Sequence, residues 1–120
     1  MSVACVFCNI VSGEIPSNKV FEDDYAVAFT DISPVAPVHV LVIPRVHVTF
    51  LAEILAEISQ SEQDERLLGH LLAVASRVAM EHGLDENGYR LTVNQGQDAG
   101  QIVDHLHVHV LGGRQLAKIG

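Results

Sequence analysis

Three histidines alternate with apolar residues near the end of the chain, in the run His105-Leu106-His107-Val108-His109. In a β-strand, alternate side chains point to the same face, so the three imidazoles would form one row with a spacing of about 6.5–7 Å. Such a row fits two chemistries: neutral imidazole is a metal ligand, and a group that titrates near neutral pH can act as a nucleophile or an acid–base catalyst. A solvated strand face is the third interpretation, but the strict alternation argues against it.

A loop with two glycines, Gly96 and Gly100, comes shortly before this run. Glycine lets backbone N–H groups turn toward an anion, and Asn94 and Gln101 offer side-chain donors on either side. Such a loop is common by itself, but beside a row of imidazoles it predicts a phosphate cradle. His39, which opens the run HVLVI, is a further candidate because a second imidazole can orient the first through a hydrogen bond.

The two cysteines of the chain, Cys5 and Cys8, form a C-x-x-C pair. A metal site, a redox pair and two reduced core thiols all fit this spacing. The N-terminal stretch has no basic region and carries Asn9, Glu14 and Pro16, so we do not interpret it as a signal peptide. We therefore expect a cytoplasmic protein, in which a structural disulfide is rare.

Composition excludes several classes of protein. The chain has 120 residues, of which 48% are hydrophobic and 18% charged, as in a folded domain with a genuine core. The formal net charge of -8 argues against binding to DNA or RNA, although a small phosphorylated ligand remains compatible with it. No apolar run approaches the roughly 20 residues that cross a bilayer, so we expect no membrane association.

The elements that must position these groups are mostly short strands. We expect strands over residues 19–22, 26–30, 39–43, 89–94 and 104–111, short helices over 7–11 and 49–58, and one long helix over 62–82 with an apolar stripe. Most connections between neighbouring strands are too short for parallel crossovers. The pattern predicts an α+β fold, with an antiparallel sheet and the long helix packed on one face.

Together these motifs resemble the histidine triad (HIT) family, whose signature is His-φ-His-φ-His-φ-φ with φ apolar. The run HLHVHVL, residues 105–111, satisfies it at every position. CVFCNIVSGEIP resembles the opening segment of the family and FEDDYAVAFTDISPVAPVHVLVIPRVH its strand core. GYRLTVNQGQDAGQIVDHLHVHVLGGRQ resembles its active-site half, and the GGRQ ending is closest to the histidine triad nucleotide-binding proteins, the purine nucleoside phosphoramidases. The resemblance implies a single HIT domain over residues 1–120, a five-stranded antiparallel sheet with one long and one or two short helices, and a homodimer that shares a ten-stranded sheet.

The resemblance also implies a mechanism. His107 would attack the α-phosphorus of a nucleoside 5′-phosphoramidate or a related nucleotidyl substrate, and water would then release AMP or GMP from a covalent nucleotidyl-histidine. His109 would bind a phosphate oxygen, His39 would support the triad, and Asp31 would hold the ribose hydroxyls. The further residues assigned to the nucleotide are Phe7, Ile10, Ile15, Phe29 and Ile32 around the base, and Asn94 and Gly100, with Gln101 of the same loop, at the phosphate and leaving group.

Some branches of the family bind structural zinc through a C-x-x-C pair, a later histidine and the first histidine of the triad. The matching residues are Cys5, Cys8, His47 and His105. Two thiolates and two imidazoles make a closed tetrahedral set, which suits a structural ion. In that case His105 cannot relay protons, and His107 and His109 carry the chemistry.

The chain departs from the family pattern at three places. Ile102 stands where phosphoramidases usually carry a serine that contacts the leaving group, and isoleucine has no hydrogen to donate. Asp104 stands at a position that is usually aromatic, and the ending LAKIG lacks an aromatic tail. Ile102 favours an alternative function, that of a nucleotide-binding regulatory or scaffold protein with little turnover. A metal-handling protein that uses the histidine row itself is a third hypothesis.

Overall fold

The computed structural model describes residues 5–53 and 62–119. Along the chain lie α1 (Val6–Ser12), β1 (Lys19–Glu22), β2 (Ala26–Thr30), β3 (Val38–Pro44), α3 (Glu62–Glu81), β4 (Tyr89–Thr92), a short 3₁₀ helix (Gln97–Ala99) and β5 (Val108–Gly112). Residues 51–53 are also helical. The rest of the helix that we predicted over 49–58 lies outside the described residues from position 54 onward.

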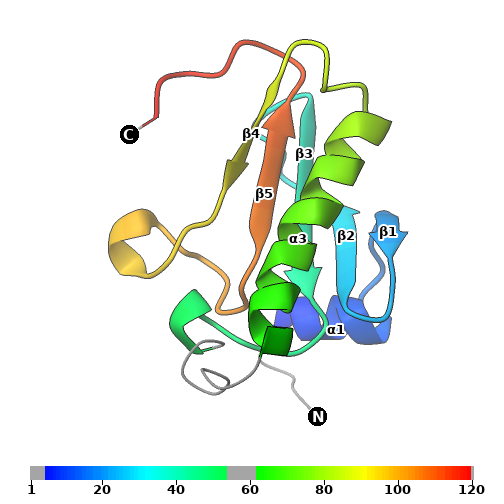
Figure 1. The fold of residues 1–120 in the computed structure, drawn as a ribbon, viewed down its shortest axis with the longest axis vertical. Helices are drawn as coiled ribbons and strands as arrows, with labels where there is room; N and C mark the ends of the chain where they lie inside the picture. The colour runs from blue at the N-terminus through cyan, green and yellow to red at the C-terminus, as the bar shows by residue number, and fades with distance from the viewer. Residues whose placement is uncertain (1–4, 54–61, 120) are drawn as a thin grey trace.

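The strands form one antiparallel sheet in the order β1-β2-β3-β5-β4. The long helix α3 crosses one face of this sheet (Figure 1). The predicted α+β fold, with a five-stranded antiparallel sheet and one long helix, is therefore confirmed. Within the described part of the chain, no helix combines the length and the apolar character needed to cross a bilayer.

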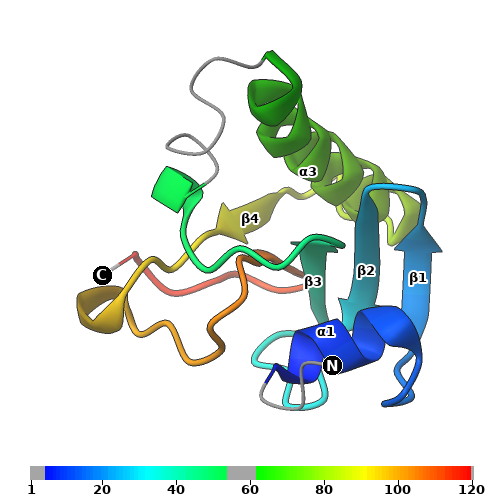
Figure 2. The same cartoon turned by 90° about the horizontal axis from the view of Figure 1, so that it is seen from below.

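The two faces of the sheet are covered by different helices, as the view from below shows (Figure 2). Alternation along each strand sends side chains to opposite faces: in β2, Ala26 and Ala28 pack on the α3 side, whereas Val27 and Phe29 pack on the α1 side. The apolar residues that alternate with the histidines also lie on the α3 side, namely Leu106, Val108 and Val110. The α1 face is therefore left for the histidines.

Two predicted strand boundaries were wrong by more than one residue: β5 begins at Val108 and not at residue 104, and β4 ends at Thr92 and not at residue 94. The ladder between β3 and β5 ends at the pair Val42 and Val108. By the same register Leu106 would pair with Pro44, which has no N–H to donate. Instead, the N–H of Leu106 donates to the carbonyl of Val48 at 2.7 Å. His105 and His107 consequently lie in a segment that precedes the strand.

Candidate active site and metal centre

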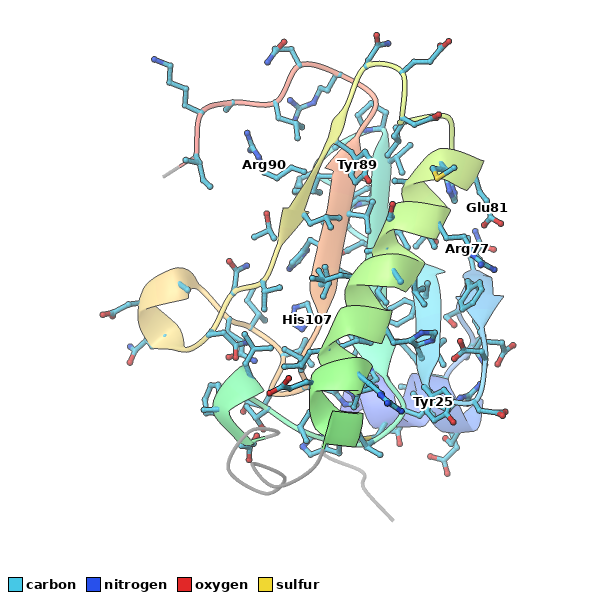
Figure 3. All side chains as sticks on the ribbon, viewed as in Figure 1. Tyr25, Arg77, Glu81, Tyr89, Arg90 and His107 are labelled. Carbon is cyan, nitrogen blue, oxygen red and sulfur yellow. The ribbon has the colours of Figure 1, made fainter. Side chains whose placement is uncertain are left out.

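A cleft of about 370 Å³ opens on the α1 side of the sheet, where β5 begins. Figure 3 shows His107 at the start of this strand, beside the segment that leads into it. The cleft is lined by the following predicted site residues: Phe7, Ile10, Ile15, Phe29, Asp31, Ile32, Asn94, Gly100, His107 and His109. Residues from α1, β2, the 3₁₀ loop and β5 thus meet around one cavity.

His107 is held in one orientation by the main chain. Its Nδ1 lies 2.7 Å from the carbonyl oxygen of His105, so Nδ1 carries the hydrogen and donates it. The other ring nitrogen, Nε2, then has a free lone pair. The ring of Phe7 packs edge-on against this imidazole, with 5.1 Å between centroids. His107 is only 6% exposed, and what is exposed faces the cleft.

His39 and His109 form a hydrogen-bonded pair beside it. The distance between Nε2 of His39 and Nδ1 of His109 is 2.9 Å. Burial, followed by the charges of His107 and His39, lowers the pKa of His109 to about 4. Burial also lowers the pKa of His39, against the opposing effect of Asp31. Both imidazoles are therefore neutral near pH 7.

Asp31 stands at the edge of this pair. One carboxylate oxygen, Oδ2, lies 3.4 Å from Nε2 of His39, and the other, Oδ1, accepts a hydrogen bond from the N–H of Ser33 at 2.8 Å. The residue that the family resemblance assigns to the ribose therefore also faces the imidazoles, a contact that the sequence did not indicate.

The loop before the histidines is tied shut by Gln101. Its side-chain oxygen accepts from the N–H of Gly96 at 2.8 Å, and its amide nitrogen donates to the carbonyls of Thr49 and Val103. Gln101 does not line the cleft, whereas Asn94 and Gly100 do. The side chain that we expected near the nucleotide thus shapes the loop that faces it.

Apolar side chains form the remaining wall of the cleft. Phe7 and Phe29 meet edge to face with centroids 5.4 Å apart. Leu41 and Val103 are among the further lining residues that were not predicted. Leu41 follows His39 by two positions in β3, so the alternation in HVLVI was a usable signal. Ile102 also lines the cleft and is 91% exposed, so its apolar side chain meets solvent.

A second group of side chains lies on the other side of Phe7, and we call it the cysteine–histidine cluster. It consists of Cys5, Cys8, His47 and His105. Their ligand atoms all lie within 4.8 Å of one another. Nε2 of His105 donates to the carbonyl of Pro44 at 2.9 Å, which leaves the Nδ1 lone pair facing Cys5 Sγ at 3.4 Å. Burial lowers the pKa of His105 and favours the neutral, ligating form. Two sulfurs and two imidazoles in this arrangement fit a tetrahedral metal ion.

The comparisons with known proteins agree with this geometry. The model of the HIT domain family matches residues 12–116. The purine nucleoside phosphoramidase of Escherichia coli strain K12 is 41% identical over 119 residues, which are 99% of this chain and 95% of that protein. A HIT family hydrolase from Legionella pneumophila Philadelphia 1 is 43% identical with a TM-score of 0.85, over 94% of this chain and 96% of that chain. A zinc-bound histidine triad family protein from Mycobacterium smegmatis is 32% identical with a TM-score of 0.77, over 100% of this chain and 82% of that chain.

Proposed function

The chain belongs to the histidine triad (HIT) family of hydrolases, and from this premise we propose that it cleaves nucleoside 5′-phosphoramidates or related nucleotidyl substrates with release of AMP or GMP. The observation that carries the proposal is the hydrogen bond from Nδ1 of His107 to the carbonyl of His105. In the neutral ring this bond leaves the lone pair of Nε2 free to act as a nucleophile, in a cleft that also offers apolar walls and a carboxylate.

The reaction would proceed in two displacements on the α-phosphorus. In the first, Nε2 of His107 forms a bond to phosphorus while the P–N bond breaks, and the amine leaves with one proton taken up from solvent. In the second, water attacks phosphorus and returns a proton to solvent, the bond to His107 breaks, and the nucleoside monophosphate departs. A hydrogen on His109 would stabilise the charge that develops on a phosphate oxygen.

The rest of the cleft suits the nucleoside. Phe7, Ile10 and Phe29 offer an apolar surface for a purine base, and the carboxylate of Asp31 can accept hydrogen bonds from ribose hydroxyls. Asn94 and Gly100 line the same cavity, beside and in the loop closed by Gln101. We assign them to the phosphate and the leaving group.

The experiment that tests this function measures AMP release from adenosine 5′-phosphoramidate by the wild-type protein and by His107→Ala. We expect release by the wild type and none by the variant, with AMP binding retained by both in a direct titration. A folded wild type that binds AMP and releases none from the phosphoramidate contradicts the proposal. That result favours the alternative function, a nucleotide-binding protein with little turnover, which Ile102 supports because it offers the leaving group no hydrogen bond.

We further propose that the cysteine–histidine cluster holds structural zinc. The cluster supplies four ligand atoms, and the hydrogen bond from His105 to Pro44 aims Nδ1 at the sulfurs. A closed set of four protein ligands has no position for substrate, so the ion would fix the segment that presents His107 and take no part in the reaction.

A homodimer with a continuous ten-stranded sheet is the last part of the proposal. The sheet has two edge strands, β1 and β4. A register irregularity between Lys19 and Phe21, together with the charges of Lys19 and Glu22, makes β1 unsuitable for pairing. No such irregularity interrupts β4. We therefore expect two copies to pair along β4, and sedimentation equilibrium tests whether the chain forms a dimer.

A further inference from the structure

The described residues contain two sets of side chains that a metal ion could bridge. The buried histidine of one set donates a hydrogen bond to the backbone, whereas that of the other accepts one from it. The first is the cysteine–histidine cluster, in which His105 donates to a backbone carbonyl and turns a bare nitrogen toward the sulfurs. The second is the group of Asp31, His39 and His109 in the cleft, whose ligand atoms also lie within 4.8 Å of one another. The hydrogen-bond partner of its buried member, His39, determines which ring nitrogens of this second group carry hydrogens.

That partner is a backbone N–H and not a carbonyl. The N–H of Val35 donates to Nδ1 of His39 at 3.2 Å. A nitrogen that accepts a hydrogen bond carries no hydrogen, so the hydrogen of neutral His39 must be on Nε2. Nε2 therefore donates to Nδ1 of His109 at 2.9 Å. This in turn leaves the hydrogen of neutral His109 on Nε2, where it can be donated to a ligand in the cleft.

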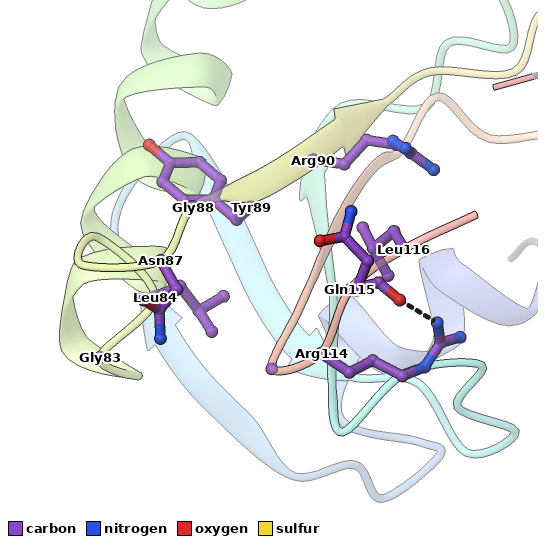
Figure 4. A pocket seen from close by; sticks show the side chains of 10 residues that line it. Gly83, Leu84, Asn87, Gly88, Tyr89, Arg90, Arg114, Gln115 and Leu116 are labelled. Carbon is purple, nitrogen blue, oxygen red and sulfur yellow. Dashed lines mark hydrogen bonds between the residues drawn. The ribbon is translucent and has the colours of Figure 1, made fainter. Parts of the chain in front are cut away.

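The turn that presents Val35 is held by the C-terminal segment. The guanidinium of Arg114 donates to the carbonyl of Val35 at 2.7 Å and to the carbonyl of Gln115 at 2.9 Å. Figure 4 shows the second of these bonds. Gly113 adds a close approach, because a Cβ placed there would lie 2.8 Å from Cβ of Pro37. Two contacts from consecutive residues thus fix residues 35–37 against the end of β5.

We propose that the N–H of Val35, held in place by Arg114, is the positioning group that puts a hydrogen on His39 Nε2 and thereby on His109 Nε2. His39 and His109 then work as successive hydrogen-bond donors toward a phosphate oxygen, with the carboxylate of Asp31 beside them as an acceptor, and the three residues do not form a metal site. The catalytic consequence rests on the proposed function, whereas the placement of the hydrogens does not. Neither Val35 nor Arg114 lines the cleft.

The placement of the hydrogens is tested by ¹⁵N NMR of the imidazoles, with the His39 signals assigned by their loss in His39→Gln. We compare Val35→Pro, which removes the N–H, with Val35→Ala, which keeps it and shortens a side chain that is already 62% exposed. We expect wild type and Val35→Ala to carry the hydrogen on Nε2 alone, and Val35→Pro to show it also on Nδ1. A folded Val35→Pro variant with the hydrogen still on Nε2 alone overturns the proposal.

Arg114→Ala provides a second variant in case the proline substitution prevents folding. Its matched control is Arg90→Ala, since Arg90 is half-buried and likewise donates to a backbone carbonyl of the same segment, that of Ala117. We expect Arg114→Ala to raise the Nδ1–H population of His39 and Arg90→Ala to leave it unchanged. An unchanged population in Arg114→Ala removes Arg114 from the proposal.

The kinetic readout separates this inference from the proposed function. For Val35→Pro we expect kcat on adenosine 5′-phosphoramidate to fall about tenfold, the effect of one misdirected hydrogen bond, with KM changed less than about twofold. A protein that shows the tautomer shift but no phosphoramidase activity in the wild type would refute the proposed substrate and retain the positioning role. A tautomer shift with unchanged kcat in an active enzyme would refute the catalytic consequence.

Discussion

The carbonyl oxygen of His105 accepts a hydrogen bond from Nδ1 of His107 at 2.7 Å, while the imidazole of His105 belongs to the cysteine–histidine cluster. One residue therefore serves two sites, with its side chain in the proposed metal centre and its backbone on the proposed nucleophile. Any change that frees the His105 side chain should also loosen the ring of His107.

Loss of metal should consequently reduce both stability and turnover. For Cys8→Ser we expect metal affinity to fall at least about 100-fold, more than the loss typical of residues around the ligands, with a lower midpoint of thermal unfolding and a lower kcat. Metal content by atomic absorption, thermal unfolding and AMP release check this prediction. Metal content that survives removal of both cysteines would instead show that the histidine row holds the ion.

The histidines of the cleft should make stability depend on pH. His39 and His109 have pKa values below the usual 6.5, and that of His109 is about 4. Between about pH 6.5 and pH 4 these histidines are protonated in the unfolded chain but stay neutral in the folded chain. The free energy of unfolding therefore falls as the pH falls. Each such histidine adds a slope of up to about 1.4 kcal/mol per pH unit.

Urea unfolding of wild type and His109→Gln at several pH values in this window checks the prediction. We expect the free energy of unfolding to depend less steeply on pH in the variant, by the slope of about 1.4 kcal/mol per pH unit that corresponds to one proton. The carboxylates and the other histidines contribute equally to both proteins. Parallel slopes would mean that His109 titrates alike in the folded and unfolded states.

Ile102→Ser should raise the rate of P–N cleavage. The side chain lines the cleft and is 91% exposed, so a hydroxyl fits there without disturbing the core. A hydrogen bond to the leaving nitrogen corresponds to an increase in kcat of about twofold to tenfold. Ile102→Val is the control, since it changes size without adding a donor, and an equal response of the two variants would contradict this role.

Gly113→Ala should destabilise the fold more than Gly88→Ala. Both glycines have positive φ, +96° and +97°, so both variants incur the same backbone strain of about 1 kcal/mol. Only at Gly113 would the added Cβ also meet another residue, Pro37 at 2.8 Å, whereas nothing lies within 4 Å at Gly88. Chemical denaturation should give a difference of about 1–2 kcal/mol between the two variants, and equal losses would show that Pro37 moves aside freely.

Much of this architecture could be predicted from residue patterns. Alternation in HLHVHVL correctly separated Leu106, Val108 and Val110, which pack under α3, from the histidines on the opposite face. The start of the strand could not be predicted from this run, because it depends on Pro44 in the neighbouring strand. A proline that removes a ladder hydrogen bond is visible in the sequence, but its partner is known only once the register is known.

The partners of individual polar side chains were harder to predict. The side-chain amide of Gln101 could bind a ligand, yet it accepts a hydrogen bond from Gly96 of its own loop and donates one to the carbonyl of Thr49. The hydrogen bond from Val35 to His39 comes from a backbone N–H, which nearly every residue type has, so the sequence could not indicate it. Sequence pattern thus indicates which residues share a face, whereas the direction of each hydrogen bond depends on the folded main chain.

The seven-residue helix α1 contributes side chains to both sites. Cys8 contributes to the cysteine–histidine cluster, and Phe7 and Ile10 form the apolar wall of the cleft. Consecutive residues in an α-helix are rotated by about 100°, so one residue inserted between Phe7 and Cys8 would turn either the sulfur or the wall away from its partners. A change in the length of the N-terminal helix should therefore disturb both sites at once, although the helix lies about a hundred positions from the histidines that it supports.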